Sequence, residues 1–380
     1  MKGILWLVPA FALTAQAGTV TREGNYWVDT VTGSAPVEQA LRVATQGGVT
    51  VEGTTAGDVV TYTLKRRVKA SNENAARGAL DKIGVKTRHE GGWTVLDVTL
   101  CDSSRCSAEI RLQVPRRLRE VALATGGGAI QALDLDGVLR ADTGGGPVQV
   151  DRVQSAVTVR TGGGAVRVGK IGGKLECFTG GGAITAETLG SSSALNTGGG
   201  QIVVREAKDV VRARTGGGSI RVEKATRGVE AFAGGGLIDV VEAGGPVLAE
   251  TGGGSIKVRS SANVQCKSGA GTIQLQSVTG ALRAATSAGS IVADLSGAAG
   301  FQDSVLTTSM GDITVLIPSN LAVTIEATNH TPGSHRIVSD FPEIRPGGEG
   351  GSQARGALHG GGPVLRLVAT GGTIYLRQQK

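Results

Sequence analysis

Small apolar and polar residues alternate along the middle of the chain in a pattern that repeats every 18 residues. If a recurrent threonine is taken as position 0 of the unit, positions 5 and 7 are isoleucine, valine or alanine. Positions 10, 14 and 16 are again mostly small or branched apolar residues, with single variable residues between many of them. This alternation is typical of β-strands with one buried face. Every unit is therefore expected to contribute strands to a shared interior.

Three glycines follow the threonine that opens each unit. This sequence begins at Thr125, Thr143, Thr161, Thr179, Thr197, Thr215 and Thr251, and Ala233 replaces threonine in the remaining unit. Because glycine adopts positive φ and lets backbones approach closely, the glycine triplet predicts a corner. The alternation also changes phase twice in each unit. We interpret these changes as corners between a short strand near positions 4–8 and a longer run near positions 10–17 that bends at position 12.

Strands and corners at a constant period predict an all-β fold, a parallel β-solenoid (β-helix) with about 18 residues per coil. Each strand is expected to pair with the coils above and below it at a spacing of ~4.8 Å. A left-handed triangular helix also uses about 18 residues per coil, but it requires an apolar residue every six positions, which these columns lack. The predicted stack covers residues 121–327, and the handedness of its coil is left open.

Residues 18–120 do not follow the period and predict a small N-terminal β-rich cap with one helix. Alternation predicts strands at Gly48–Gly53, Val59–Leu64, Trp93–Leu100 and Ala108–Val114. A helix is predicted at Ser71–Ile83, with Ser71 as its N-cap and an apolar face made by Ala75, Ala76, Ala79, Leu80 and Ile83. Such a cap covers the open first coil, whose unpaired backbone groups are prone to aggregation.

The two ends of the chain carry separate signals. Lys2, an apolar run from Ile4 to Leu13 and the small-residue sequence Ala15-Gln16-Ala17 predict a secretory signal peptide over residues 1–17. Residues 328–362 are rich in glycine, proline and histidine and predict a long loop, after which residues 363–380 return as strands that close the solenoid. No later stretch is long and apolar enough to predict a transmembrane span. The mature chain is expected in the periplasm, on the outer cell surface or in the medium.

The four cysteines fall into two classes. Export permits a disulfide between Cys101 and Cys106, and two free thiols are the alternative. Cys177 and Cys266 both occupy the inward position 16, about 24 Å apart if coils are spaced at 4.8 Å, which is too far for a bond. These two cysteines are therefore interpreted as buried apolar residues.

Composition limits the possible partners. Aromatic residues make up only 3% of the chain, which suits a narrow interior filled by valine, isoleucine, leucine and alanine. The net charge is +7, but the basic residues are scattered and mostly faced by acids. A solvated surface therefore explains the charge better than a nucleic-acid partner does.

The outward columns predict no catalytic site. A carbohydrate-active enzyme requires acids gathered on one face, whereas here acids alternate with bases, as in Asp134 and Arg152 or Glu187 and Arg205. We interpret these columns as ion ladders between neighbouring strands. The histidines His330, His335 and His359 match no common metal-ligand spacing and are interpreted as solvated loop residues. No catalytic, cofactor-binding or metal-binding residue is predicted, no cofactor is expected, and no outward column forms an aromatic or single-charge stripe.

The chain resembles the bacterial putative-adhesin family, exported β-strand-repeat domains of unknown function. The resemblance covers nearly the whole mature chain and rests on the repeated Gly-x-Ile-x-Val and on several shorter motifs. These are Gly48-Val49-Thr50-Val51, the segment at Pro115, Met310-Gly311-Asp312-Ile313, Ile317-Pro318, Ser339-Asp340-Phe341-Pro342 and Gly360-Gly361-Gly362-Pro363. The resemblance implies a β-solenoid of the cell envelope and carries over no catalytic residue.

These observations predict an exported, non-enzymatic β-solenoid of the bacterial cell envelope, an adhesin or an interaction or structural module. The alternative is a carbohydrate-active β-helix enzyme, a polysaccharide lyase or hydrolase. The expected partner is an envelope polysaccharide or protein, and the oligomeric state is left open.

Overall fold

The computed structural model describes residues 16–55, 57–101, 105–296, 300–331 and 336–379. The predicted signal peptide lies almost entirely outside these residues. The chain folds as two units, Met1–Ser155 and Ala156–Lys380, and each is described by itself. The domain bounds that the sequence suggests stay a prediction. No helix within the described ranges has the length and apolar character needed to cross a bilayer.

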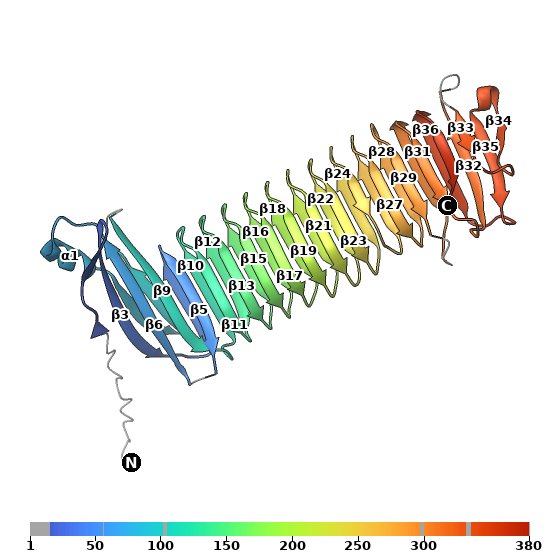
Figure 1. The fold of residues 1–380 in the computed structure, drawn as a ribbon. Helices are drawn as coiled ribbons and strands as arrows, with labels where there is room; N and C mark the ends of the chain where they lie inside the picture. Colours follow the sequence, from blue (N-terminus) through green and yellow to red (C-terminus); the bar gives the residue numbers. More distant parts are fainter. Residues whose placement is uncertain (1–15, 56, 102–104, 297–299, 332–335, 380) are drawn as a thin grey trace, which may run out of the picture. The chain divides into compact units, whose positions relative to one another are not determined.

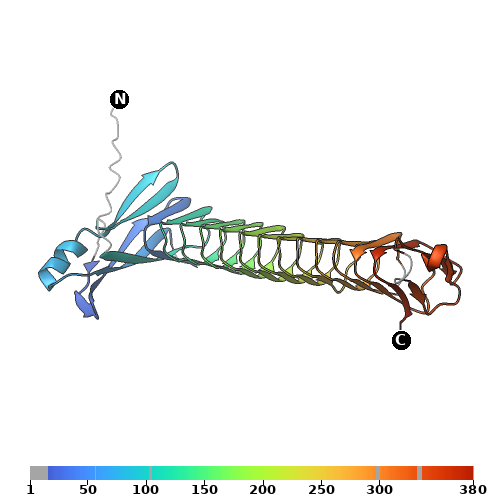
Figure 2. The same ribbon diagram turned by 90° about the horizontal axis from the view of Figure 1, so that it is seen from above.

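The second unit is a parallel β-solenoid in which each coil gives one strand to each of two sheets, as the sequence predicts (Figure 1). Figure 2 shows the two layers facing each other, with turns joining them. Sheet I contains, in spatial order, β14 (Val157–Thr161), β16 (Leu175–Thr179), β18 (Ser193–Thr197), β20 (Val211–Thr215), β22 (Val229–Ala233), β24 (Val247–Thr251), β26 (Val264–Ser268), β28 (Leu282–Thr286), β30 (Ser304–Met310), β36 (Val364–Gly371), β32 (Val323–Asn329), β35 (Gln353–Leu358) and β34 (Arg345–Gly347). Sheet II contains β15 (Val166–Ile171), β17 (Ile184–Leu189), β19 (Ile202–Ala207), β21 (Ile220–Ala225), β23 (Ile238–Ala243), β25 (Ile256–Val258), β27 (Ile273–Val278), β29 (Ile291–Leu295), β31 (Ile313–Ile317), β37 (Ile374–Gln378) and β33 (Ile337–Ser339).

The predicted inward columns form the interior between the sheets. In one coil Ile184, Ala186, Leu189 and Leu195 all have 0% exposure. Neighbouring strands pair without offset, so Ile184 lies beside Ile202 and the columns continue from coil to coil. A shift of one residue would turn every one of these side chains to solvent, so their burial fixes the register.

The predicted corners are only partly correct. The strands cover positions 5–10 and 14–18, so the corners are the glycine triplet and positions 11–13, where the sequence suggested only a bend. The phase change that we interpreted as a corner lies inside a strand. In β17, Glu187 and Thr188 are consecutive and neither is buried, while Ala186 and Leu189 are. The strand is locally irregular at this point, as in a β-bulge, and does not turn.

Close backbone approach explains the glycine triplets, and positive φ does not. Within the described residues, none of the triplet glycines has positive φ. A Cβ on Gly200 would lie 2.1 Å from the Gly182 carbonyl oxygen of the preceding coil, and a Cβ on Gly198 would lie 2.1 Å from the oxygen of Gly180. A Cβ on the middle glycine, Gly199, would meet nothing within 4 Å. In this coil, stacking therefore requires the first and third glycines and not the middle one.

The threonines of position 0 form a buried column that links the coils. The Oγ1 of Thr197 donates a hydrogen bond to the Gly182 carbonyl of the preceding coil at 2.8 Å. The same oxygen accepts a hydrogen bond from the Gly200 backbone N–H of its own corner at 3.1 Å. The hydroxyl therefore satisfies backbone groups of two successive turns. The same pattern repeats at Thr215 and Thr251.

The C-terminal segment is more ordered than the predicted loop. Of residues 328–362, the described part contains β33, β34, a 3₁₀-helix (Glu349–Gly351) and β35. Strand β36 lies between β30 and β32, so the last coil of the chain is inserted one place before the end of the stack. The antiparallel strands β35 and β34 then end sheet I. His335 and Pro332 lie outside the described residues.

The first unit begins with coils that the sequence period did not identify. Its elements are β1 (Gln16–Ala17), β2 (Thr21–Glu23), β3 (Tyr26–Pro36), β4 (Ala40–Thr45), β5 (Gly48–Thr54), β6 (Val59–Val68), α1 (Glu73–Leu80), β7 (Gly84–Glu90), β8 (Trp93–Thr99), β9 (Cys106–Pro115), β10 (Glu120–Thr125), β11 (Ile130–Leu135), β12 (Val138–Thr143) and β13 (Val148–Val153). The four strands predicted from alternation are present as β5, β6, β8 and β9. Strands β4 and β5 pair in parallel with β10 and β11, and β8 and β9 pair in parallel with β4 and β5.

Antiparallel strands and the helix cap this unit. Strand β7 ends one sheet against β8. In the other sheet β6 pairs with β9, β3 pairs with β6, and the short strands β1 and β2 pair with β3. The helix is shorter than predicted, and its N-cap is Asn72, not Ser71, because the Asn72 side chain accepts the Ala75 N–H. Ala75 is exposed, contrary to prediction, while Leu80 is buried. The buried guanidinium of Arg66 holds the C-terminal end by donating to the carbonyls of Leu80 and Ile83 at 2.9 Å each.

Candidate functional site

The predicted ion ladders are present on the outer face of sheet II. Arg205 contacts Glu187 at 3.1 Å, and Lys224 contacts Glu242 at 3.1 Å, each pair joining neighbouring strands. Exposed pairs of this kind contribute about 0–1 kcal/mol each. The carboxylates in these ladders each have a basic partner, so they serve strand register more readily than proton transfer.

A ladder pair in the first unit shows the same arrangement. The Nη2 of Arg152 lies 2.6 Å from the Asp134 carboxylate on the neighbouring strand. This hydrogen bond holds the pKa of Asp134 below its ordinary value. Asp134 therefore carries its charge at any pH above that value, as a partner of arginine.

The described histidines belong to different segments of the chain. His330 follows β32, and its backbone N–H donates to the Ala369 carbonyl at 2.9 Å. His359 follows β35 at a positive φ, while in the first unit the Nδ1 of His89 lies 3.6 Å from the Glu38 carboxylate. Among the described residues, no group of three histidine, cysteine or acidic side chains is placed to hold a metal ion.

The cysteines behave as the sequence suggested. Cys101 and Cys106 form a disulfide, with their Cα atoms 6.1 Å apart, which decides between the two alternatives. Cys177 and Cys266 are free and buried. Burial raises the pKa of Cys177 to about 12, so its thiol stays protonated and unreactive.

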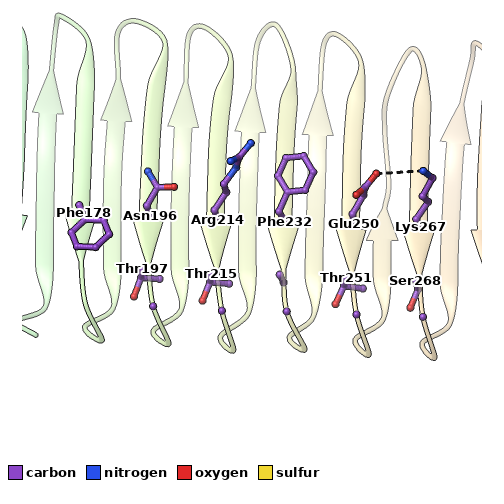
Figure 3. A pocket seen from close by; sticks show the side chains of 16 residues that line it. Phe178, Asn196, Thr197, Arg214, Thr215, Phe232, Glu250, Thr251, Lys267 and Ser268 are labelled. Carbon is purple, nitrogen blue, oxygen red and sulfur yellow. Dashed lines mark ion pairs between the residues drawn. The ribbon is translucent and has the colours of Figure 1, made fainter.

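A groove of about 680 Å³ crosses sheet I from β16 to β26, beside the glycine corners. Figure 3 shows that one outward side chain from each successive strand lines it. Five of these side chains occupy position 17 of their units: Phe178, Asn196, Arg214, Phe232 and Glu250. The next coil is one residue shorter, and its Lys267 pairs beside Glu250 and continues the column. Residues of the threonine column and the first glycines of the triplets complete the lining. We call this feature the position-17 groove.

The repeat itself explains why a groove forms here. Position 17 points outward because positions 16 and 18 on either side of it are buried, as at Leu195 and Thr197. The three residues that follow the threonine position are all glycine in five of these coils, and in the sixth Ala270 adds only a methyl group, so no large side chain lies beside the column there. The glycines that stacking requires therefore also leave one side of the column open.

The position-17 groove combines apolar, amide and charged groups. Phe178 has 53% of its surface exposed, although large apolar residues are normally buried. The guanidinium carbon of Arg214 lies 4.9 Å from the centre of the Phe232 ring, a cation–π contact. At the far end, the ammonium of Lys267 lies 3.8 Å from the Glu250 carboxylate. Exposed rings beside polar groups are typical of a binding surface.

Reasoning from the sequence missed this groove. Phe178 and Phe232 are far apart in the chain and looked like isolated residues, so no aromatic stripe was predicted. The available signal was their shared position in the repeat, which places them in one outward column. The second signal was that the adjoining triplets consist of glycine, apart from Ala270.

Sheet I carries another hollow, of about 440 Å³, at the opposite ends of the same strands. Its lining includes Pro246 and Leu248 together with Arg227 and Arg283. This hollow is a second surface on the same face, so a substitution in it can serve as a control for substitutions in the position-17 groove.

Comparison with known proteins gives only distant structural likenesses. No protein-family model and no curated protein matches the chain. A putative cell adhesion protein from Clostridium sporogenes is similar at 8% identity and a TM-score of 0.16, covering 97% of this chain and 100% of its own. A putative adhesin from Parabacteroides distasonis has 11% identity, a TM-score of 0.30 and coverages of 76% and 97%. A putative adhesin from Bacteroides fragilis has 16% identity, a TM-score of 0.29 and coverages of 64% and 95%. These descriptions name the family that the sequence resembles, and no site residue is carried over from them.

Proposed function

We propose that the protein is an exported, non-enzymatic interaction module of the bacterial cell envelope, of the adhesin type, that binds an extended envelope component in the position-17 groove. The observation that carries this proposal is the groove itself. It places Phe178, Phe232 and Arg214 in one outward column across neighbouring strands of a continuous sheet. A repeating scaffold of this kind suits a partner that is itself extended.

Two features of the sequence and one of the structure support the rest of the proposal. The predicted signal peptide supports export. The resemblance to envelope β-repeat domains supports an interaction role, and the pairing of ladder acids with bases supports binding over catalysis. A lyase or hydrolase would need carboxylates free to act as acid and base.

The test uses the mature chain, residues 18–380, in a glycan array and in pull-downs from envelope extract. We expect reproducible binding that the double variant Phe178→Ala/Phe232→Ala weakens at least ten-fold. The matched control is Leu248→Ala, which removes an apolar side chain from the other hollow of the same sheet face. The unfolding temperature of each variant should lie within a few degrees of that of the parent protein, because the substituted side chains lie on the surface.

Three outcomes would overturn the proposal. Binding that only Leu248→Ala reduces would place the site in the other hollow. Silence in both assays would remove the interaction role. Glycan cleavage that is abolished by changing one acid would make the protein an enzyme.

A further inference from the structure

Two arginines on the same strand of sheet I have different surroundings. The Nε of Arg212 lies 3.0 Å from the Glu230 carboxylate on the next strand. Arg214, two residues further along β20, has no ion pair among the described residues, and its guanidinium lies against the Phe232 ring. The strand therefore presents one neutralised arginine and, inside the position-17 groove, one available for a ligand.

The contact with Phe232 holds the guanidinium of Arg214 in place while leaving it able to bind an anion. An aromatic ring restrains the guanidinium without using its N–H donors, which remain free at its edge. The planar fork of donors matches the two oxygens of a carboxylate and forms paired, charge-assisted hydrogen bonds. Glu250, the acid that lines the groove, is already paired with Lys267 at 3.8 Å. The charges that line the groove, two basic and one acidic, favour an anionic ligand.

The neighbouring side chains indicate what else the ligand carries. Asn196, on the strand before Arg214, offers an amide that both donates and accepts hydrogen bonds, as sugar hydroxyls require. Phe178, one strand further, offers an exposed apolar ring. Successive side chains are ~4.8 Å apart along the column, a distance similar to the length of one sugar in an extended chain. The order is apolar ring, amide, cation, apolar ring.

We infer that the ligand of the position-17 groove is a linear glycan bearing carboxylate groups, that is, a uronic-acid polymer; this inference rests on the proposed function. Arg214 binds a carboxylate, Asn196 binds hydroxyls, and Phe178 packs against the apolar face of a sugar. Phe232 is a positioning residue that holds the guanidinium of Arg214.

An extended peptide suits this surface less well. Peptides that bind a sheet usually add a strand at an unpaired edge. The strands beneath the groove are paired on both sides, as β20 is with β18 and β22. Backbone pairing is therefore closed to a peptide at this site, and only its side chains would make contacts.

The experiment measures binding of the mature chain to polygalacturonate, alginate and hyaluronate by calorimetry. Each polymer is compared with its methyl-esterified form, which keeps the sugars and removes the charge. We expect at least one acidic polymer to bind about ten- to a hundred-fold more tightly than its ester, as the loss of a charged hydrogen bond implies. Added salt should narrow this difference.

Variants on the same strand give the matched control. Arg214→Gln should abolish the preference for the acid over the ester, and Arg214→Lys should restore part of it, because the charge returns without the planar fork. Arg212→Gln should leave the preference unchanged. Phe232→Leu should reduce the preference while the ester continues to bind as before. Circular dichroism confirms that each variant is folded.

The outcomes separate this inference from the proposed function. If acid and ester bind equally and Arg214→Gln changes neither, the acidic-glycan inference is wrong and the groove still binds glycans. If only neutral glycans or an envelope protein bind in the groove, the inference is likewise wrong while the interaction role stands. If neither form of any polymer binds and the envelope extract yields no partner, both fail.

Discussion

The middle and third glycines of one triplet should respond in opposite ways to the same substitution. A Cβ on Gly200 would lie 2.1 Å from the Gly182 oxygen, 2.4 Å from its carbonyl carbon and 2.8 Å from the Ala183 nitrogen. All three are backbone atoms of the neighbouring coil, so no side chain can move to relieve the contact. Gly199 is adjacent in sequence, and a Cβ there meets nothing within 4 Å.

The expected magnitudes follow from these contacts. Gly200→Ala has to separate two stacked coils, which strains the hydrogen bonds of Thr197 to both corners. Overpacking costs ~1–3 kcal/mol where side chains can adjust, so we expect a loss of about 3 kcal/mol or more. Gly199→Ala should instead stabilise by ~0.4–1 kcal/mol, because alanine restricts the unfolded chain. Other coils support the distinction, since Ala270 and Ala288 occupy the middle position.

The assay is urea unfolding followed by circular dichroism, combined with hydrogen exchange of the amides in β16 and β18, the paired strands that lead into the two corners. Stability in stacked repeats is approximately a sum of local terms, so exchange reports the affected coils and the urea midpoint reports the whole chain. Gly200→Ala should lower the midpoint and increase exchange in these strands. If Gly199→Ala destabilises the chain as much as Gly200→Ala does, close approach is not the reason for the glycines.

Three further predictions concern the threonine column, a ladder pair and the disulfide. Ala233→Thr should stabilise by ~0.5–1.5 kcal/mol, because it restores the hydroxyl that bridges two corners; an unchanged urea midpoint would contradict this role for the column. The pKa of Asp134 is lowered from its ordinary value of 3.8, so the ion pair with Arg152 stabilises the fold above pH 3.8. This stabilisation is lost as the pH falls below that value. Asp134→Asn should therefore flatten the acid limb of the stability curve, and an unaltered slope would count against the pair. Replacing Cys101 and Cys106 by serine should cost ~2 kcal/mol, as closure of a short loop predicts, with the effect confined to exchange in β8 and β9.

The sequence predicted the coil well because several independent structural requirements recur with the same 18-residue period. The inward residues at positions 5, 7, 10, 14 and 16, the threonine hydrogen bonds and the close approach of glycines all repeat together. Ile184 and Ile202 are neighbours in the stack for the same reason that they share a position in the repeat. A register error would break all three constraints at once.

The first coils were missed because an insertion separates them from the regular array. Thr45 pairs beside Thr125 and Val49 beside Ile130, so β4 and β5 form a coil of the usual kind. Its corner reads Gln46-Gly47-Gly48, which differs from the triplet only at its first residue. Strands β6 to β9 and helix α1 then separate this coil in sequence from the first regular coil, which begins at Glu120. A search by period alone does not recover a coil whose neighbours in space are distant in sequence.

The phase change within the strand was misread for a related reason. Alternation shows which residues face inward, but two consecutive outward residues are produced equally by a corner and by a bulge. Asp134 and Arg152 have positive φ, as a local distortion requires. Only the pairing that continues on both sides, to Leu135 and Val153, identifies it as part of a strand.

The positions of the repeat that maintain the fold differ from the position that lines the groove. Within this one chain, position 17 changes from Phe178 through Asn196 and Arg214 to Phe232, while the residues at positions 16 and 18 stay small and buried. The stack therefore tolerates aromatic, amide and charged side chains at this position, because none of them enters the interior. The solenoid fixes the spacing of these groups, and the glycine corner keeps one side of them open. Ligand preference then depends on the order of side chains along the column, which changes without altering the packing that holds the coils together.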